Sequence, residues 1–142
     1  MRNKRLGPDN YASFLIWQVA NKWEKRVNSE LKEFDLTQAE YYQLASLFWL
    51  SQHQEEVTQT DIAKFADTIP MNTSKIMTKF EKKGLVKRVA GSDSRSKSLS
   101  ITDNGEHIAI QATAKLNCLN EQFFDKDDDR NFLNHLKYLK TK

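Results

Sequence analysis

Residues 83–102 read KGLVKRVAGSDSRSKSLSIT, with apolar residues near both ends and a small, polar, basic tip between them. The segments Val86–Ala90 and Ser98–Ile101 have the length and composition of strands, and Gly91 and Asp93 suit the turn that joins them. The stretch therefore predicts an exposed two-stranded hairpin. Cations at the tip of such a hairpin cannot stabilise a core, so they are either solvated loop residues or contacts to a binding partner.

Helical patterns flank this hairpin on both sides. With four Gly and two Pro in 142 residues, the chain is predicted to be mainly α-helical, with few turns and one domain spanning 1–142. Thr37 with Glu40, and Thr58 with Asp61, have the spacing of capping boxes, and Thr102 suits an N-cap. Helices are expected at about 10–33, from 37, from 58, at about 72–83, after 102 and from 127, with Gly84 at the C-cap of the fourth.

Apolar residues at helical spacing indicate which faces are buried. The first helix carries a stripe from Ile16 to Phe34, which is longer than a small core needs. Part of it is expected to cover a partner chain, and the alternative is that the whole stripe belongs to an ordinary monomer core. The two helices before the hairpin are expected to bury, in turn, Ile62, Phe65 and Ala66, then Ile76, Met77 and Phe80.

The charge is concentrated in one block. The formal net charge is only +3, but residues 71–102 hold eight Lys and Arg against two acids, whereas residues 37–70 hold one Lys against five acids. Such asymmetry favours a polyanionic partner. A solvated helix face followed by a soluble loop would give the same charge count, so charge alone leaves both interpretations open.

Several classes of protein are disfavoured. No apolar run approaches the length of a membrane span, and a single cysteine, Cys118, rules out an internal disulfide and favours a reducing cytoplasm. The three histidines have no metal-ligand spacing, and no phosphate-binding loop or nucleophile–base set is found, so neither a metal, a cofactor nor an enzyme is expected. Cys118 is expected to be an inert thiol.

Two short helices followed by a hairpin indicate a winged helix-turn-helix. The second helix would enter a DNA major groove, because its solvent side is expected to carry hydroxyl, amide and ammonium groups that bind base edges and phosphates. These residues are Asn72, Thr73, Ser74, Lys75, Thr78 and Lys79.

The hairpin tip would reach an adjacent minor groove, where the potential is most negative and an inserted Arg is favoured. Arg95 is the candidate for that insertion, and Asp93 is placed to pair with it and limit its rotamers. Lys87, Arg88 and Lys97 would bind the flanking phosphates.

The segment KFEKKGLVKRVAGSDSRSKSLSITDNG resembles the signature of the MarR family of winged-helix transcriptional regulators, with Asp93, Arg95, Thr102 and Gly105 in register. The upstream VTQTDIAKFADTIPMNTSKIMTKF resembles the helix-turn-helix of that family. The resemblance implies a DNA-binding lobe at 37–102 and a homodimer held by helices at 10–34 and 103–140. It further implies a pseudo-palindromic operator on double-stranded DNA and a regulator that is more often a repressor.

The resemblance also implies a small aromatic effector bound between the dimerisation helices and the DNA-binding lobe. The aromatic residues that could line its pocket are Phe14, Trp17, Tyr41, Tyr42, Phe48 and Trp49. Placement in the core is the alternative for each of them. The alternative for the whole chain is a winged-helix protein-interaction module that does not bind DNA.

Overall fold

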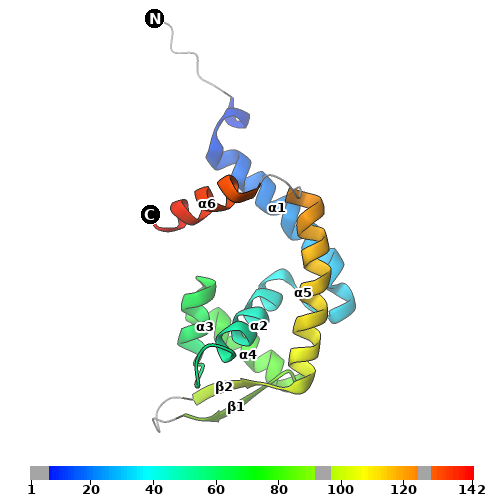
Figure 1. Cartoon of the computed structure of the whole chain (residues 1–142), viewed down its shortest axis with the longest axis vertical. Helices are drawn as coiled ribbons and strands as arrows, with labels where there is room; N and C mark the ends of the chain where they lie inside the picture. Colours follow the sequence, from blue (N-terminus) through cyan, green and yellow to red (C-terminus); the bar gives the residue numbers. More distant parts are fainter. Residues whose placement is uncertain (1–6, 92–96, 125–128) are drawn as a thin grey trace, which may run out of the picture.

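The computed structural model describes residues 7–91, 97–124 and 129–142. Within these ranges the chain is mainly helical, with six α-helices and one antiparallel hairpin, as the sequence predicted (Figure 1). In chain order the elements are η1 (Pro8–Asn10), α1 (Ala12–Leu31), η2 (Lys32–Phe34), α2 (Gln38–Ser51), α3 (Gln59–Ala66), α4 (Pro70–Lys82), β1 (Val86–Ala90), β2 (Lys97–Ile101), α5 (Asp103–Phe124) and α6 (Asp129–Lys140).

These elements form two regions along the long axis of the molecule. Helices α2, α3 and α4 and the hairpin make a lobe at one end, and α5 leads from the hairpin toward α1 and α6 at the other (Figure 1). Helix α2 is central, because it packs against α1, α3, α4, α5 and β2. No helix in the described ranges is long and apolar enough to cross a membrane.

The predicted helix starts are confirmed by their capping hydrogen bonds. The Thr37 hydroxyl accepts from the Glu40 backbone N–H at 3.2 Å, and the Glu40 carboxylate accepts from the Thr37 N–H at 2.9 Å. Thr58 and Asp61 form the same reciprocal pair at 3.1 and 2.9 Å. Such bonds satisfy backbone donors that the first helical turn leaves unpaired.

Residues in the left-handed backbone region end two of the helices. Gly84 follows α4 with φ of 72°, a conformation that glycine adopts without steric cost. Asp67 takes the same region after α3, with φ of 54°, and its N–H bonds back to the carbonyl groups of α3. The turn between α3 and α4 thus closes without glycine, because Asp tolerates this conformation better than most residues.

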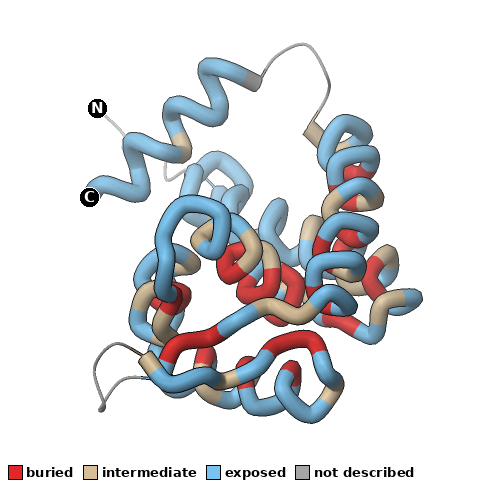
Figure 2. Tube along the Cα trace, turned by 60° about the horizontal axis from the view of Figure 1, so that its bottom comes forward, coloured by how far each residue is buried: buried red, intermediate tan, exposed pale blue. Residues whose placement is uncertain are grey.

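The hydrophobic core lies in the lobe and along the inner side of α5 (Figure 2). Three predicted core positions differ from expectation: Ala66 and Ile76 are half-buried, and Phe65 is 48% exposed. At 100° per residue, Phe65 lies about 110° from the middle of the face formed by Ile62 and Ala63. Its ring therefore stays at the edge of α3. The side chains that are fully enclosed include Leu31, Leu44, Leu47, Ile62, Met77 and Phe80.

The hairpin is anchored to the lobe through β2. Val86 pairs with Ile101 and Ala90 with Lys97, so β2 begins one residue earlier than predicted. The Leu99 N–H donates to the Val57 carbonyl at 2.7 Å, and a β-bridge joins Thr58 to Ser98. The root of the wing is therefore fixed beside the start of α3.

The far end of the molecule is apolar but exposed. Figure 2 shows almost all of α6 as exposed, and none of the described side chains of α6 is buried. Residues 12–20 of α1 are also exposed, except for the half-buried Phe14. The exposed apolar residues are Leu15, Ile16, Trp17 and Val19 in α1, and Phe132, Leu133, Tyr138 and Leu139 in α6. The predicted stripe of the first helix is thus buried only in its second half, at Val27 and Leu31.

Candidate nucleic-acid interface

The rotation of α4 about its own axis is set by three residues that face the core. Thr73, Met77 and Phe80 are each fully buried. The Thr73 hydroxyl donates to Gln43 Oε1 at 3.2 Å, and the Gln43 amide donates to the Thr68 hydroxyl at 2.9 Å. The two threonine oxygens lie 3.1 Å apart. We call Gln43, Thr68 and Thr73 the polar triad; it ties the first turn of α4 to α2.

The expectation that Thr73 lies on the solvent side of this helix is wrong. Its exposed fraction is 0%, because Gln43 satisfies its hydroxyl inside the lobe. A buried hydroxyl is tolerated when it is hydrogen-bonded. The sequence spacing does indicate that Thr73 is buried, because Thr73 precedes Met77 by four residues and Phe80 by seven, which places all three on one face of the helix.

The opposite side of α4 forms an exposed stripe. At 100° per residue, four side chains fall within 50° of the direction that points away from the buried face, and Lys79 lies just beyond them at about 53°. We call them the outer stripe: Met71, Lys75, Thr78 and Lys82, all exposed. Lys75 and Thr78 were predicted from the sequence, whereas Met71 and Lys82 were not. Asn72 is exposed and Ser74 half-buried on the two flanks of the stripe.

Lys79, predicted as a DNA contact, fastens α4 to the start of α2. Its ammonium lies 2.7 Å from Glu40 Oε2. Burial alone would raise the pKa of Glu40, but the hydrogen bonds from Lys79 and from the Thr37 backbone outweigh it and hold this pKa below its ordinary value. The same hydrogen bond raises the pKa of Lys79. This lysine is already paired within the protein.

The wing is braced against α4 by Arg88. Its guanidinium donates to the Thr78 hydroxyl at 2.9 Å and to the Ser74 carbonyl at 3.5 Å, and lies 3.7 Å from a carboxylate oxygen of Glu81. Arg88 is therefore half-buried and positions the hairpin relative to the outer stripe. Among the other predicted wing residues, Lys87 and Lys97 are exposed, while Asp93 and Arg95 lie outside the described residues.

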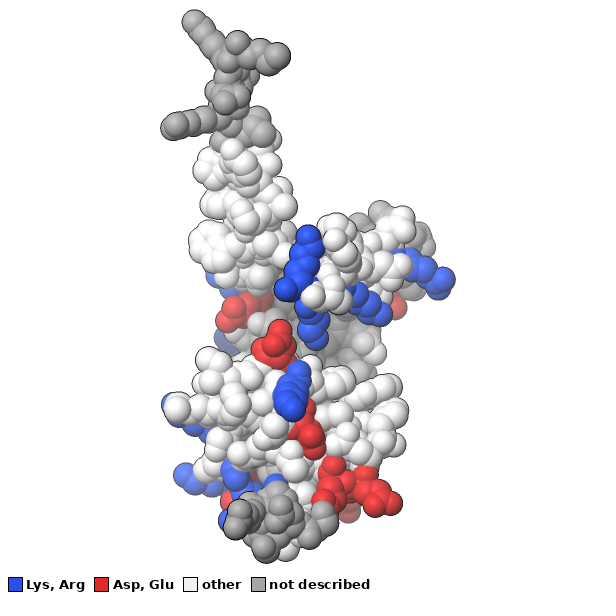
Figure 3. All heavy atoms as spheres, turned by 90° about the vertical axis from the view of Figure 1, so that its left-hand side faces the viewer, with Lys and Arg blue, Asp and Glu red and all other residues white. Residues whose placement is uncertain are grey.

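The two signs of charge are separated on this lobe. Figure 3 shows acidic side chains gathered at one of its edges and basic side chains at the other. The described lysines of α4 and of the wing root that form no ion pair with another described residue are Lys75, Lys82, Lys87 and Lys97. A concentrated field of this kind favours a polyanion over a small anion, because many weak contacts add along its length.

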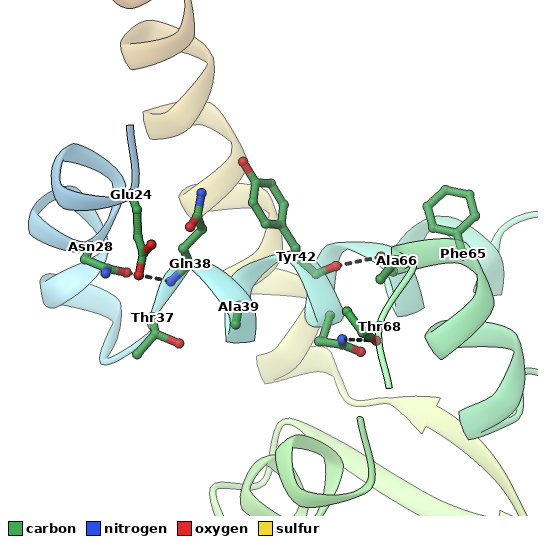
Figure 4. A pocket seen from close by; sticks show the side chains of 11 residues that line it. Glu24, Asn28, Thr37, Gln38, Ala39, Tyr42, Phe65, Ala66 and Thr68 are labelled. Atoms are coloured by element: carbon green, nitrogen blue, oxygen red, sulfur yellow. Dashed lines mark hydrogen bonds between the residues drawn. The ribbon is translucent and has the colours of Figure 1, made fainter. Parts of the chain in front are cut away.

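A pocket of about 750 Å³ lies between α1, α2 and the end of α3 (Figure 4). Of the six aromatic residues predicted to bind an effector, only Tyr42 lines it. Tyr41 is buried with its hydroxyl 2.7 Å from that of Thr113, and burial raises its pKa. Phe14 and Phe48 are half-buried, whereas Trp17 and Trp49 are exposed.

The pocket adjoins the polar triad. Gln43 and Thr68 belong to its lining, together with Asn28, whose side chain accepts from the Gln38 backbone N–H at 2.7 Å. Gln43 could not be identified from the sequence, because a glutamine between apolar residues of a helix gives no sign of a partner 30 residues away. Among the described residues, no cluster of three His, Cys, Asp or Glu side chains could hold a metal ion, and Cys118 is exposed.

Comparisons with known proteins agree with this geometry. The model of the MarR family matches residues 40–97, which include most of α2 and all of α3, α4 and β1. The HTH-type transcriptional regulator YdcH of Bacillus subtilis (strain 168) is 33% identical over 139 residues, covering 96% of this chain and 95% of its own.

Solved structures share the fold at lower identity. The MepR–DNA complex of S. aureus superimposes with a TM-score of 0.80 at 18% identity, covering 95% of this chain and 96% of MepR. CouR from Rhodococcus jostii RHA1, bound to p-coumaroyl-CoA, gives a TM-score of 0.79 at 21% identity, covering 96% and 94%. With YdcH matched over nearly its whole length, the chain belongs to the MarR family of winged helix-turn-helix transcriptional regulators, which are not enzymes.

Proposed function

We propose that the protein is a homodimeric repressor that binds a pseudo-palindromic site on double-stranded DNA. The observation that carries this proposal is the outer stripe of α4, which projects from the lobe opposite the buried Thr73, Met77 and Phe80. A helix with side chains fits the width of a major groove. MepR, a structural neighbour, is seen in complex with DNA.

The lobe at 37–102 would place α4, the wing root and the wing tip against three different parts of the DNA duplex. Helix α4 lies in the major groove, with Lys75 and Lys82 near the phosphates on its rims. Lys87 and Lys97 at the wing root bind the next phosphates along the backbone, and Arg95 at the tip enters the minor groove. Arg88 holds the angle between helix and wing through Thr78, so it acts chiefly by positioning.

The dimer is proposed from the exposed apolar surface at the far end of the molecule. Helices within 10–34 and 103–140 would supply this interface, because a soluble protein rarely leaves two such apolar faces in water. A twofold axis would set two α4 helices about 34 Å apart, in successive major grooves of a pseudo-palindrome. A dimer seated across two grooves blocks any other protein from the overlapping site, which is how repression would follow.

A small aromatic effector would bind in the pocket beside the polar triad. Gln43 and Thr68 both line the pocket, and both contact the Thr73 hydroxyl of α4 through their side-chain oxygens. A ligand that draws the Gln43 amide away would release the first turn of α4, and a ligand shifts the DNA-binding equilibrium only through such a difference between the two states. Weaker DNA binding in the presence of a ligand whose own binding is lost in Tyr42→Ala would support this role.

The test of the proposed function is DNA binding at several salt concentrations. A dimer with about 6–10 phosphate contacts should lose about 10³–10⁵ in affinity between 50 and 200 mM salt. Lys75→Ala should weaken binding to all duplexes. It should also reduce the magnitude of the slope of log affinity against log salt concentration by about 2, because one phosphate contact is lost in each of the two protomers. Lys22→Ala, an exposed lysine of α1 in the other region, is the matched control and should keep the full slope.

The rival interpretation, a winged-helix module that binds only proteins, predicts a different outcome. Retention on nonspecific duplex DNA at low salt would then be weak and would not change with salt. A protein that selects no sequence from random duplexes and shows such a flat response would overturn the proposed function.

A further inference from the structure

Met71 is a large apolar side chain at the leading end of the outer stripe. It is 66% exposed in the first turn of α4, directly after Pro70, and Ile69 before that proline is 65% exposed. Isolated exposed apolar residues are common on protein surfaces. The position of Met71 is less ordinary, because Lys75 follows it one turn later on the same stripe.

The direction of Met71 is fixed by the structure beneath it. Proline at the first helical position has a backbone angle already suited to the helix, and the buried Thr73 is bonded to Gln43. The first turn of α4 therefore cannot rotate without breaking the polar triad. A side chain held outward in this way loses little backbone freedom when it meets a ligand.

Base edges in a major groove offer one apolar group, the C5-methyl of thymine. Adenine, guanine and cytosine present only hydrogen-bond donors and acceptors there. Met71 has no hydrogen-bond donor and only a weak thioether acceptor for those polar groups, and covering one of them without a good partner costs free energy. Residues at the start of a recognition helix are the ones that face base edges.

We propose that Met71 selects thymine in each half-site of the operator by packing against its C5-methyl group. This inference rests on the proposed DNA-binding function and names one base that the operator contains. The flexible thioether side chain suits a contact with a small methyl group. The adjacent Asn72 is exposed and carries the amide that pairs with adenine, so two successive side chains favour A·T base pairs.

The experiment compares thymine with uracil, which differ only by this methyl group. Duplexes that bind the wild-type protein are selected from a random pool, and each thymine of a half-site is then replaced by uracil in turn. At one position, uracil should weaken binding about fourfold per half-site, and about 15-fold when both half-sites carry it.

Two variants decide whether Met71 is the residue responsible. Met71→Ala should bind the thymine and uracil duplexes with equal affinity, whereas Lys75→Ala should bind both more weakly and keep the ratio between them. Because both side chains are exposed, both variants should melt within about 2 °C of wild type, and circular dichroism establishes this before binding is compared.

Three other outcomes would overturn the Met71 inference, and only the last of them would also overturn the proposed function. If the wild-type protein binds the selected duplexes equally well with uracil at every position, the Met71 inference is overturned and the proposed function stands. If Met71→Ala keeps the uracil penalty, another residue contacts the methyl group and the inference again fails. If the wild-type protein selects no duplex at all, the proposed function fails, and this inference fails with it.

Discussion

Thr73→Val separates the role that the structure gives Thr73 from the one that its sequence neighbourhood suggested. The substitution keeps a branched side chain of similar shape and replaces the hydroxyl with a methyl group. In the structure that hydroxyl donates to Gln43 Oε1 at 3.2 Å, inside the lobe. The variant should therefore lose stability and should not lose a DNA contact.

The expected loss of folding free energy follows from the buried Gln43 oxygen that would no longer have a hydrogen-bond donor. Gln43 is 2% exposed, so its carbonyl oxygen would stay buried without a donor, which costs about 1–3 kcal/mol. Thr68 is exposed, so its hydroxyl can bond to water instead. Burying the added methyl group recovers part of the loss. The net destabilisation should be about 1–2 kcal/mol, which corresponds to a Tm lower by about 3–7 °C for a chain of this length.

A double-mutant cycle makes the assay specific. Urea unfolding is measured at one fixed protein concentration for wild type, Thr73→Val, Gln43→Leu and the double variant, because dimerisation makes stability depend on concentration. With both polar partners replaced by apolar groups, no buried oxygen is stranded. The double variant should therefore be more stable than the sum of the single losses predicts, by about 1 kcal/mol.

Two results would refute this reasoning. If the losses of the single variants add without coupling, the hydrogen bond contributes nothing. If Thr73→Val unfolds like wild type but binds operator DNA much more weakly, Thr73 faces the duplex and the rotation of α4 described above is wrong.

Three further predictions concern other contacts. Because hydrogen bonds hold the pKa of Glu40 below its ordinary value, its stabilising contribution is present above the unfolded pKa and is lost as pH falls through the folded pKa. Glu40→Gln should thus flatten the acid limb of a stability–pH profile below about pH 5. Gly105→Ala should destabilise by about 1–3 kcal/mol in thermal unfolding, because the new Cβ would lie 2.2 Å from the Leu85 carbonyl oxygen. Leu133→Asp should give a monomer in sedimentation analysis and leave the circular dichroism spectrum unchanged, whereas a variant that stays dimeric would place the interface elsewhere.

Features that depend on neighbours along the chain could be predicted from the sequence. The pairs Thr37–Glu40 and Thr58–Asp61 cap their helices as predicted, because each pair needs only three residues of spacing to meet. Gly84 takes the expected positive φ for the same reason. The order of helices and hairpin follows from these local signals together with the apolar periodicity.

Features that depend on distant partners could not be predicted in the same way. Thr73 was placed outside because it is polar, and its partner Gln43 lies 30 residues earlier on another helix. Phe65 was placed inside because it is apolar, yet α3 has only eight residues and its inner face is filled by Ile62 and Ala63. Met71 was passed over because the recognition helix was predicted to begin at about residue 72, whereas α4 begins at Pro70 and includes Met71 in its first turn.

Contacts between distant residues also change how many of the eight Lys and Arg residues in 71–102 are available to bind DNA phosphates. Three of these cations are held by the protein itself: Lys79 by Glu40, Lys83 by Asp35 at 2.7 Å, and Arg88 by Thr78 and Glu81. Each of these would have to break an internal bond before it could neutralise a phosphate.

The remaining cations set the expected salt dependence. Lys75, Lys82, Lys87 and Lys97 form no ion pair with another described residue, and with Arg95 they make at most five phosphate contacts per protomer. For a dimer, four to five contacts per protomer predict a slope of log affinity against log salt of about −7 to −9. If all eight cations of the block met phosphates, the slope would be about −14. A measured slope near the larger value would mean that the pairs at Lys79, Lys83 and Arg88 open on binding, and that they hold α4 and the wing in place only while the protein is free of DNA.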